Sequence, residues 1–155
     1  AVYVANKLQE RLNVWGYIED KNYALMIEDL DSAGLLSWRG FLKTNKLQEE
    51  LCHCRALINT PKWNEAYGNV VVEAMACGVP VVAYRRGGPS EIIQHGLTGF
   101  LVDADNKYEL FEYLKKINLI DRHNCRSWVD NNASHKIFAD KVEGWLKKVI
   151  ENFNN

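Results

Sequence analysis

Short apolar runs alternate along the chain with longer segments in which apolar residues recur every three or four positions. The runs are rich in β-branched and aromatic residues, as strands are, and lie at residues 12–17, 35–40, 56–59, 80–84 and 99–102. The longer segments predict helices at residues 45–54, 69–78, 89–96, 107–117, 121–129 and 135–153. This regular succession, with nearly continuous apolar strands, predicts the α/β class: a Rossmann-like doubly wound parallel sheet with helices on both faces.

The front of the chain departs from this alternation. Residues 1–12, AVYVANKLQERL, have the pattern of the end of a helix, with no strand before them. Because an α/β unit normally opens on a strand, we expect residues 1–155 to form a single domain of a larger protein, with the first strand of its sheet missing.

Composition and charge exclude several classes of protein. Nineteen basic and twenty acidic residues give a formal net charge of −1, so the chain has no basic field that would favour nucleic acid. No apolar run approaches the length that spans a bilayer, which leaves peripheral contact as the only membrane association we expect. The cysteines, with a tight Cys52-His53-Cys54 group, lack the spacing of a zinc site, and we predict free thiols in a reduced, cytoplasmic compartment.

The candidate chemistry lies in residues 65–91, EAYGNVVVEAMACGVPVVAYRRGGPSE. A predicted helix begins near Gly68, and the unpaired N–H groups of its first turn could hold a phosphate. Glu65 would lie in the loop before this helix and Glu73 about a turn and a half into it. Carboxylates repel phosphate but accept hydrogen bonds from vicinal hydroxyls, so the pattern indicates a diphosphate flanked by sugar hydroxyls.

A plainer interpretation of the same residues stays open. Glu65 could be a surface acid that complements the helix dipole, and Glu73 a solvated helix position. Gly87, Gly88 and Pro89 could serve only as the turn between a strand and the next helix.

The run at residues 65–102, from EAYG through EAMACGVPVVA to GGPSEIIQHGLTGFLV, closely resembles the signature of the retaining glycosyltransferases of family 4, the glycosyl transferases group 1. Enzymes of that family have two Rossmann-like domains, the GT-B fold, and this chain resembles the C-terminal, donor-binding one. The resemblance implies transfer of a hexose from a nucleotide diphosphate sugar, with uridine diphosphate glucose our first expectation and guanosine diphosphate mannose the second. It also implies an N-terminal acceptor-binding domain as partner.

The resemblance assigns roles to individual residues. Glu65 would contact hydroxyls of the transferred sugar, and Glu73 would bind the ribose diol. The backbone after Glu65 would approach the sugar and diphosphate, and a glycine turn would lie near the donor. The residues concerned are Tyr67, Gly68, Asn69 and Val70 for the backbone and Gly87, Gly88 and Pro89 for the turn.

The segment WRGFL resembles the strand end beside the nucleobase, which makes Arg39, Gly40 and Phe41 candidates for the base pocket. Phe41 as a core aromatic and Arg39 as a surface charge are the alternatives. Where many relatives carry small or acidic residues, this chain has Arg85 and Arg86, and we expect one of them to reach the diphosphate, a surface ion pair being the alternative.

The family's chemistry proceeds without a metal ion, and we expect no cofactor and no metal-binding Asp-x-Asp element here. Two other functions stay open, a nucleotide-sugar epimerase of the same fold and a non-catalytic nucleotide-sugar-binding module. The last predicted helix has an apolar face, which we interpret first as core packing and alternatively as an interface with the other domain. That face contains Ile137, Val142, Trp145, Leu146, Val149 and Phe153.

Overall fold

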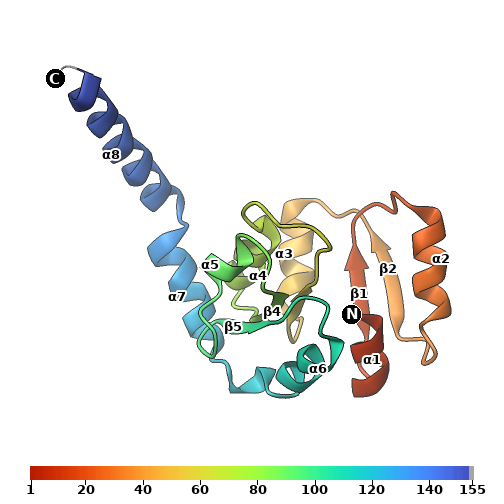
Figure 1. Cartoon of the computed structure of the whole chain (residues 1–155). Coiled ribbons are helices and arrows are strands. Elements are labelled where there is room, and N and C mark those ends of the chain that lie inside the picture. The colour runs from red at the N-terminus through yellow and green to blue at the C-terminus, as the bar shows by residue number, and fades with distance from the viewer. Residues whose placement is uncertain (154–155) are drawn as a thin grey trace.

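Strands and helices alternate through most of the chain in a computed structural model that describes residues 1–153 (Figure 1). The strands are β1 (Leu12–Trp15), β2 (Leu36–Gly40), β3 (Leu57–Asn59), β4 (Val81–Tyr84) and β5 (Gly99–Val102). The helices are α1 (Val2–Leu8), α2 (Lys21–Asp29), α3 (Thr44–Cys52), α4 (Asn69–Ala76), α5 (Pro89–Ile92), α6 (Lys107–Lys115), α7 (Arg122–Asn132) and α8 (His135–Phe153), with a 3-10 turn, η1, at Ile117–Leu119. All five predicted strands are present, and the α/β class is confirmed.

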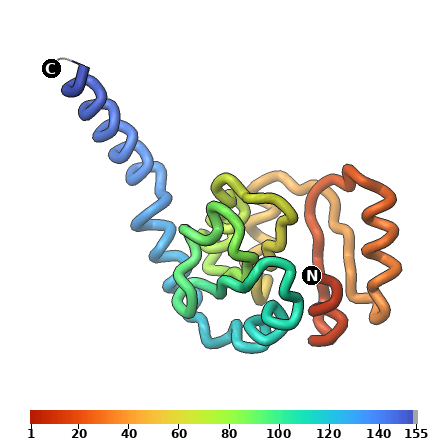
Figure 2. Tube along the Cα trace, viewed as in Figure 1, coloured from red at the N-terminus to blue at the C-terminus, as the bar shows by residue number. Residues whose placement is uncertain are grey.

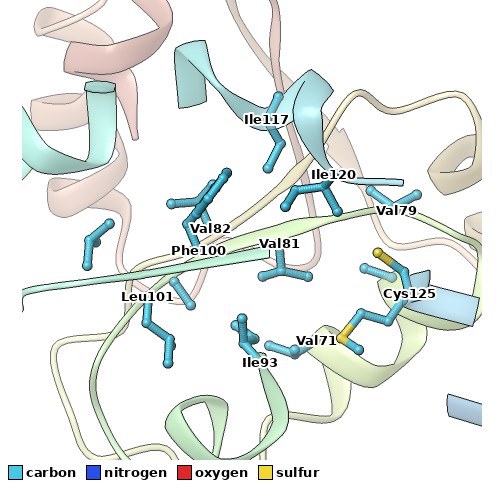
Figure 3. Close-up of a cluster of buried hydrophobic side chains, with 14 of the residues drawn as sticks. Val71, Val79, Val81, Val82, Ile93, Phe100, Leu101, Ile117, Ile120 and Cys125 are labelled. Atoms are coloured by element: carbon cyan, nitrogen blue, oxygen red, sulfur yellow. The ribbon is translucent and has the colours of Figure 1, made fainter. Parts of the chain in front are cut away.

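The core surrounds β4, whose four residues are all buried. Figure 3 shows Val82 and Phe100 on one face of the sheet, toward Ile117 and Ile120, and Val81 and Leu101 on the other, toward α4 and α5. Successive strand residues point to opposite faces, so an apolar strand of this kind needs helices on both sides. The continuous run VVAY is therefore the sequence of a central strand.

The five strands form two hydrogen-bonded groups, β1 with β2 and β3 with β4 and β5. All the pairings are parallel, and no ladder joins β1 to β3 among the described residues. A cavity of about 700 Å³ lies between the two groups. We call it the slot; its lining includes Val14 and Trp15 of β1, Leu57 and Ile58 of β3, and Ala1 and Val4 at the start of the chain.

The backbone edges of β1 and β3 face the slot. Leu12 donates its N–H to the carbonyl of Leu35, just before β2, and Gly16 donates to Gly40 of β2. The N–H groups of Asn13 and Trp15 therefore point the other way, because successive N–H groups of a strand alternate in direction. Leu57 donates to Pro80 beside β4, which turns Ile58 toward the slot. The sheet is thus split into two parts, with a largely apolar gap between β1 and β3.

Two helices differ from the sequence expectations. The pattern did not predict α2, although Asp20 caps it by accepting a hydrogen bond from the Tyr23 N–H at 3.0 Å. Helix α5 is shorter than predicted and ends at Ile92, because the buried Thr98 hydroxyl accepts the Gln94 N–H at 3.0 Å and Ile93 is extended.

Helix α8 runs away from the rest of the chain (Figure 2). None of its described residues is buried, and Trp145 and Phe153 are 62% and 90% exposed. Core packing was therefore the wrong interpretation of its apolar face, since the helix leaves the body after a short contact with α7.

Candidate functional site

The loops that follow β1, β2 and β3 lie along one edge of the molecule (Figure 1). Within each sheet the strand pairings are parallel, so its strands end at the same edge, and each strand is followed by a helix. We call the edge where the strands end the carboxyl edge. Open α/β sheets bind ligands outside this edge, and most of the candidate site residues are found here.

A glycine turn fixes the loop between β3 and α4, residues 60–68. The Gly88 N–H donates to the Glu65 carbonyl oxygen at 2.7 Å, and Glu65 forms an isolated parallel bridge with Gly87. Gly87 has φ of 65°, and a Cβ atom there would lie 2.0 Å from the Glu65 carbonyl oxygen. A Cβ atom on Gly88 would lie 2.2 Å from the carbonyl oxygen of Tyr67. The two glycines are therefore required by close approach of two backbones.

Helix α4 begins directly after this loop without a side-chain cap. Gly68, with φ of 94°, occupies the cap position, and its carbonyl accepts the N–H groups of Val71 and Val72. The N–H groups of Asn69 and Val70 have no hydrogen-bond partner among the described residues, whereas α2, α6 and α7 each have an Asp or Asn cap. The first turn of α4 thus leaves donors and the positive end of the helix dipole toward the carboxyl edge.

The two glutamates of the motif occupy different surroundings. Glu65 is half-buried, and the Trp63 indole Nε1–H donates to its Oε2 at 3.2 Å. Glu73 is exposed one and a half turns into α4, and it lines the slot together with Val70. Val70 and Glu73 are the only predicted site residues in the lining of the slot, so the slot adjoins the candidate site and does not coincide with it.

The paired arginines have different environments. Arg86 donates from Nη1 to the Pro61 carbonyl at 2.7 Å and pairs with Asp105, its Nη2 lying 2.5 Å from Oδ2. Arg85 is exposed, and its guanidinium group has no partner among the described residues. Arg86 therefore shows the ion pair that we gave as an alternative, and Arg85 is the arginine left to meet an anion.

The predicted base-pocket residues lie at the end of β2, on the other side of the slot. Arg39 is exposed and makes a loose ion pair with Glu50 at 3.9 Å, and Gly40 has φ of 67°. Phe41 is 60% exposed and stacks on Tyr17, with ring centroids 5.2 Å apart and planes inclined by 5°. Phe41 is therefore not a core residue, and the stacked pair presents an aromatic surface at the carboxyl edge.

Three residues near the site escaped the sequence analysis: Trp63, Tyr17 and Asp105. Trp63 stands two positions before Glu65, and Tyr17 follows Gly16 at the end of β1, so their positions were available as signals. Asp103 and Asp105 do have the Asp-x-Asp spacing that we did not expect to find. The Asp105 carboxylate is taken by Arg86, and the Asp103 N–H donates to Glu109.

The four cysteines are free thiols, and no group of three or more potential metal ligands occurs within residues 1–153. Cys125 is fully buried beneath α4 and donates through Sγ to the Thr98 carbonyl at 3.3 Å. Burial raises the pKa of the Cys125 thiol to about 11. Cys125 is thus a packing residue, whereas Cys54 and Cys77 are half-buried and Cys52 is exposed.

Residues 6–135 match the family model for glycosyl transferases group 1. The chain belongs to this family. Among curated relatives of the chain, sucrose synthase from Beta vulgaris is 33% identical over 129 residues, which are 79% of this chain and 16% of that protein. Sucrose synthase 1 from Hordeum vulgare is 26% identical over 140 residues, again 16% of its length.

Solved structures of glycosyltransferases have the same fold. Anabaena HepE in complex with UDP superposes with a TM-score of 0.84 at 21% identity, covering 95% of this chain and 44% of HepE. HepE has also been solved with UDP-glucose. Sucrose-phosphate synthase from Thermosynechococcus elongatus superposes with a TM-score of 0.81 at 19% identity, covering 97% of this chain and 42% of that one. The fold is therefore that of the C-terminal half of a GT-B glycosyltransferase.

The chain of this group 1 glycosyltransferase domain spans less than half of the relatives that it matches. Within residues 1–153, no helix combines the length and the apolar composition needed to cross a membrane.

Proposed function

We propose that this chain is the donor-binding domain of a retaining glycosyltransferase that moves a hexose from a nucleotide diphosphate sugar to an acceptor. The observation that carries the proposal is the junction of the 60–68 loop and α4. There Glu65, whose carbonyl oxygen accepts the Gly88 N–H, lies three residues before Gly68, where α4 begins without a side-chain cap at the carboxyl edge of a parallel sheet.

The diphosphate would lie at the start of α4. The N–H groups of Asn69 and Val70 and the helix dipole favour an anion there, and Gly68 allows its close approach. Arg85, exposed and unpaired among the described residues, would supply the cation.

The carboxylates would bind the neutral hydroxyls on either side of the diphosphate. Glu65 is held by the glycine turn before the helix, where the transferred sugar would lie, and Glu73 would accept hydrogen bonds from the ribose diol. The nucleobase would lie near Arg39, Gly40 and Phe41, beside the aromatic surface that Phe41 forms with Tyr17.

The chemistry we assign to these residues is electrostatic. Negative charge grows on the diphosphate as the glycosidic bond breaks, and N–H groups already oriented toward it stabilise that charge. Glu65 orients the sugar ring through its hydroxyls and transfers no proton in this scheme. HepE was solved with UDP and with UDP-glucose, which supports uridine diphosphate glucose as the first donor to test here.

The first experiment is calorimetric titration of the chain with uridine, guanosine and adenosine diphosphates and with their sugars. We expect saturable binding of one nucleotide, with a loss of at least about tenfold in Glu73→Ala. Glu65→Gln should weaken the sugar nucleotide and leave the free nucleotide nearly unchanged. Glu112→Gln, on an exposed glutamate of α6 that pairs with Lys115, is the matched control and should change neither affinity.

The outcome also separates the two other functions. We expect this chain to bind donor without transferring sugar, because the acceptor-binding domain would complete the cleft in the whole enzyme. An epimerase would convert the sugar of the bound nucleotide with no acceptor present. No saturable binding by the folded chain would contradict the proposal.

A further inference from the structure

Arg86 connects three loops at the carboxyl edge. It follows β4, its Nη1 donates to the Pro61 carbonyl in the loop after β3, and Asp105 belongs to the turn after β5. Its guanidinium group also lies over the Tyr84 ring, 5.8 Å from the centroid. One side chain therefore links the carboxyl ends of all three strands of the larger sheet.

The Arg86 side chain is committed to these contacts. It is only 21% exposed, and both terminal nitrogens face Asp105, at 3.4 Å for Nη1 to Oδ1 and 2.5 Å for Nη2 to Oδ2. A paired and largely covered guanidinium has little charge left for a further anion. Arg85, one residue earlier, lacks such partners among the described residues.

The 60–68 loop is thereby held at its start as well as at its end. Pro61, at the start, is buried and accepts from Arg86. Glu65 and Tyr67, toward the end, lie against Gly87 and Gly88. The Glu65 carboxylate accepts a hydrogen bond from the indole N–H of Trp63, a residue of the same loop between Pro61 and Glu65.

Asp105 has an unusual backbone conformation. Its φ of 64° lies in the left-handed region, which aspartate tolerates better than most residues but which still needs support from its surroundings. Its carboxylate, on a side chain that is 67% exposed, accepts from both Nη1 and Nη2 of Arg86.

From this geometry we infer that Arg86 is a positioning residue for the donor sugar: with Asp105 it fixes the 60–68 loop so that Glu65 meets the sugar hydroxyls, and it does not bind the diphosphate. The assignment of Glu65 to the sugar rests on the proposed function. The fixing of the loop rests only on the contacts described here.

Hydrogen exchange of the chain without any ligand tests the fixing of the loop. We expect Arg86→Ala and Asp105→Asn to speed amide exchange in residues 60–68 and at Gly88 by about tenfold, while β4 and β5 keep their protection. Arg126→Ala is the matched control. Arg126, on α7, likewise pairs with an aspartate, Asp130, and donates to a carbonyl oxygen, that of Ala76 at 2.8 Å, but these contacts do not involve the 60–68 loop. Exchange in the loop that stays unchanged in both variants would overturn the inference.

Titration with UDP and UDP-glucose tests the consequence for the sugar. We expect Arg86→Ala and Asp105→Asn to lower affinity for UDP-glucose by about tenfold and to leave affinity for UDP within about twofold. Arg86→Lys, which keeps the charge and loses the two-point pairing, should resemble Arg86→Ala in this ratio. It also serves if Arg86→Ala does not fold.

A direct role of Arg86 in binding the diphosphate gives a different pattern. Arg86→Ala would then weaken UDP and UDP-glucose equally, Arg86→Lys would keep most of both affinities, and Asp105→Asn would leave or increase them. That pattern would overturn the inference. A wild-type chain that binds no nucleotide contradicts the proposed function alone, and the exchange experiment still decides whether Arg86 fixes the loop.

Discussion

Gly87 lies against the backbone of Glu65 so closely that a Cβ atom on it would come within 2.0 Å of the Glu65 carbonyl oxygen. The same turn brings Gly88 to Tyr67, where a Cβ atom would come within 2.2 Å of the carbonyl oxygen. Two backbones at these distances cannot move apart without moving the 60–68 loop. Gly87 and Gly88 thus restrict the conformation of the loop that contains Glu65.

Gly87→Ala should destabilise the chain by at least about 3 kcal/mol, because the added carbon meets backbone and the left-handed φ is strained as well. Gly88→Ala should cost a similar amount on steric grounds alone. Denaturant unfolding followed by circular dichroism measures both. Gly144→Ala is the control: its Cβ atom would meet nothing within 4 Å, and it should leave the unfolding midpoint of the body unchanged. A midpoint for Gly87→Ala equal to that of the wild type would show that the loop is free to move.

Arg85→Ala should weaken UDP and UDP-glucose by the same factor, about fivefold, because an exposed cation beside a diphosphate contributes about 1 kcal/mol. The loss should shrink as salt rises, since the interaction is screened over about 10 Å at 0.1 M salt. Titration at two salt concentrations measures this. A loss confined to the sugar nucleotide would instead place Arg85 beside the sugar.

The amides that face the slot should exchange faster than their neighbours that pair within a sheet. The backbone N–H groups that point into the slot are those of Asn13, Trp15 and Ile58. The N–H group of Val14 points toward β2, and that of Asn59 points toward β4. We expect a difference of at least about tenfold in exchange rate, measured by NMR. Equal protection on both sides would show that β1 and β3 pair directly in solution and that the slot is closed.

Alkaline pH should destabilise the chain through Cys125. Burial raises its pKa to about 11 from an ordinary value of 9.0, so the folded state keeps the proton that the unfolded state releases. The contribution is full below pH 9 and is lost as the pH rises toward about 11, on the order of 2 kcal/mol in total. Urea unfolding between pH 8 and pH 11 measures it. Cys125→Ala should flatten this part of the profile, and a wild-type profile that is already flat would contradict the shift.

The strands were predictable from sequence because a parallel strand buried on both faces consists of consecutive apolar residues. VVAY and GFLV are runs of that kind. Helix α2 was missed although Asp20 at its start was an available cap signal; only Ala24 of this helix is buried, so it contributes little to the apolar core. The length of α5 depends on the Thr98 hydroxyl, which competes for a helix N–H from outside the helix. Such a competition is set by tertiary structure and has no local pattern.

The candidate site shows the same division. The glycine and glutamate spacing predicted which residues would gather at the start of α4, and the structure brings Glu65, Tyr67, Gly87 and Gly88 into contact. The difference between Arg85 and Arg86 was out of reach, because it depends on Asp105, which lies 19 residues beyond Arg86 in the chain. The role of each site residue in binding stays a prediction for the titrations above.

Helix α8 adds 19 residues, or about 28 Å of helix, and buries none of them. Its sequence is therefore free of the packing constraints that bind β4 to its neighbours. Substitutions on its exposed surface should therefore leave the packing around β4, and with it the stability of the sheet, unchanged.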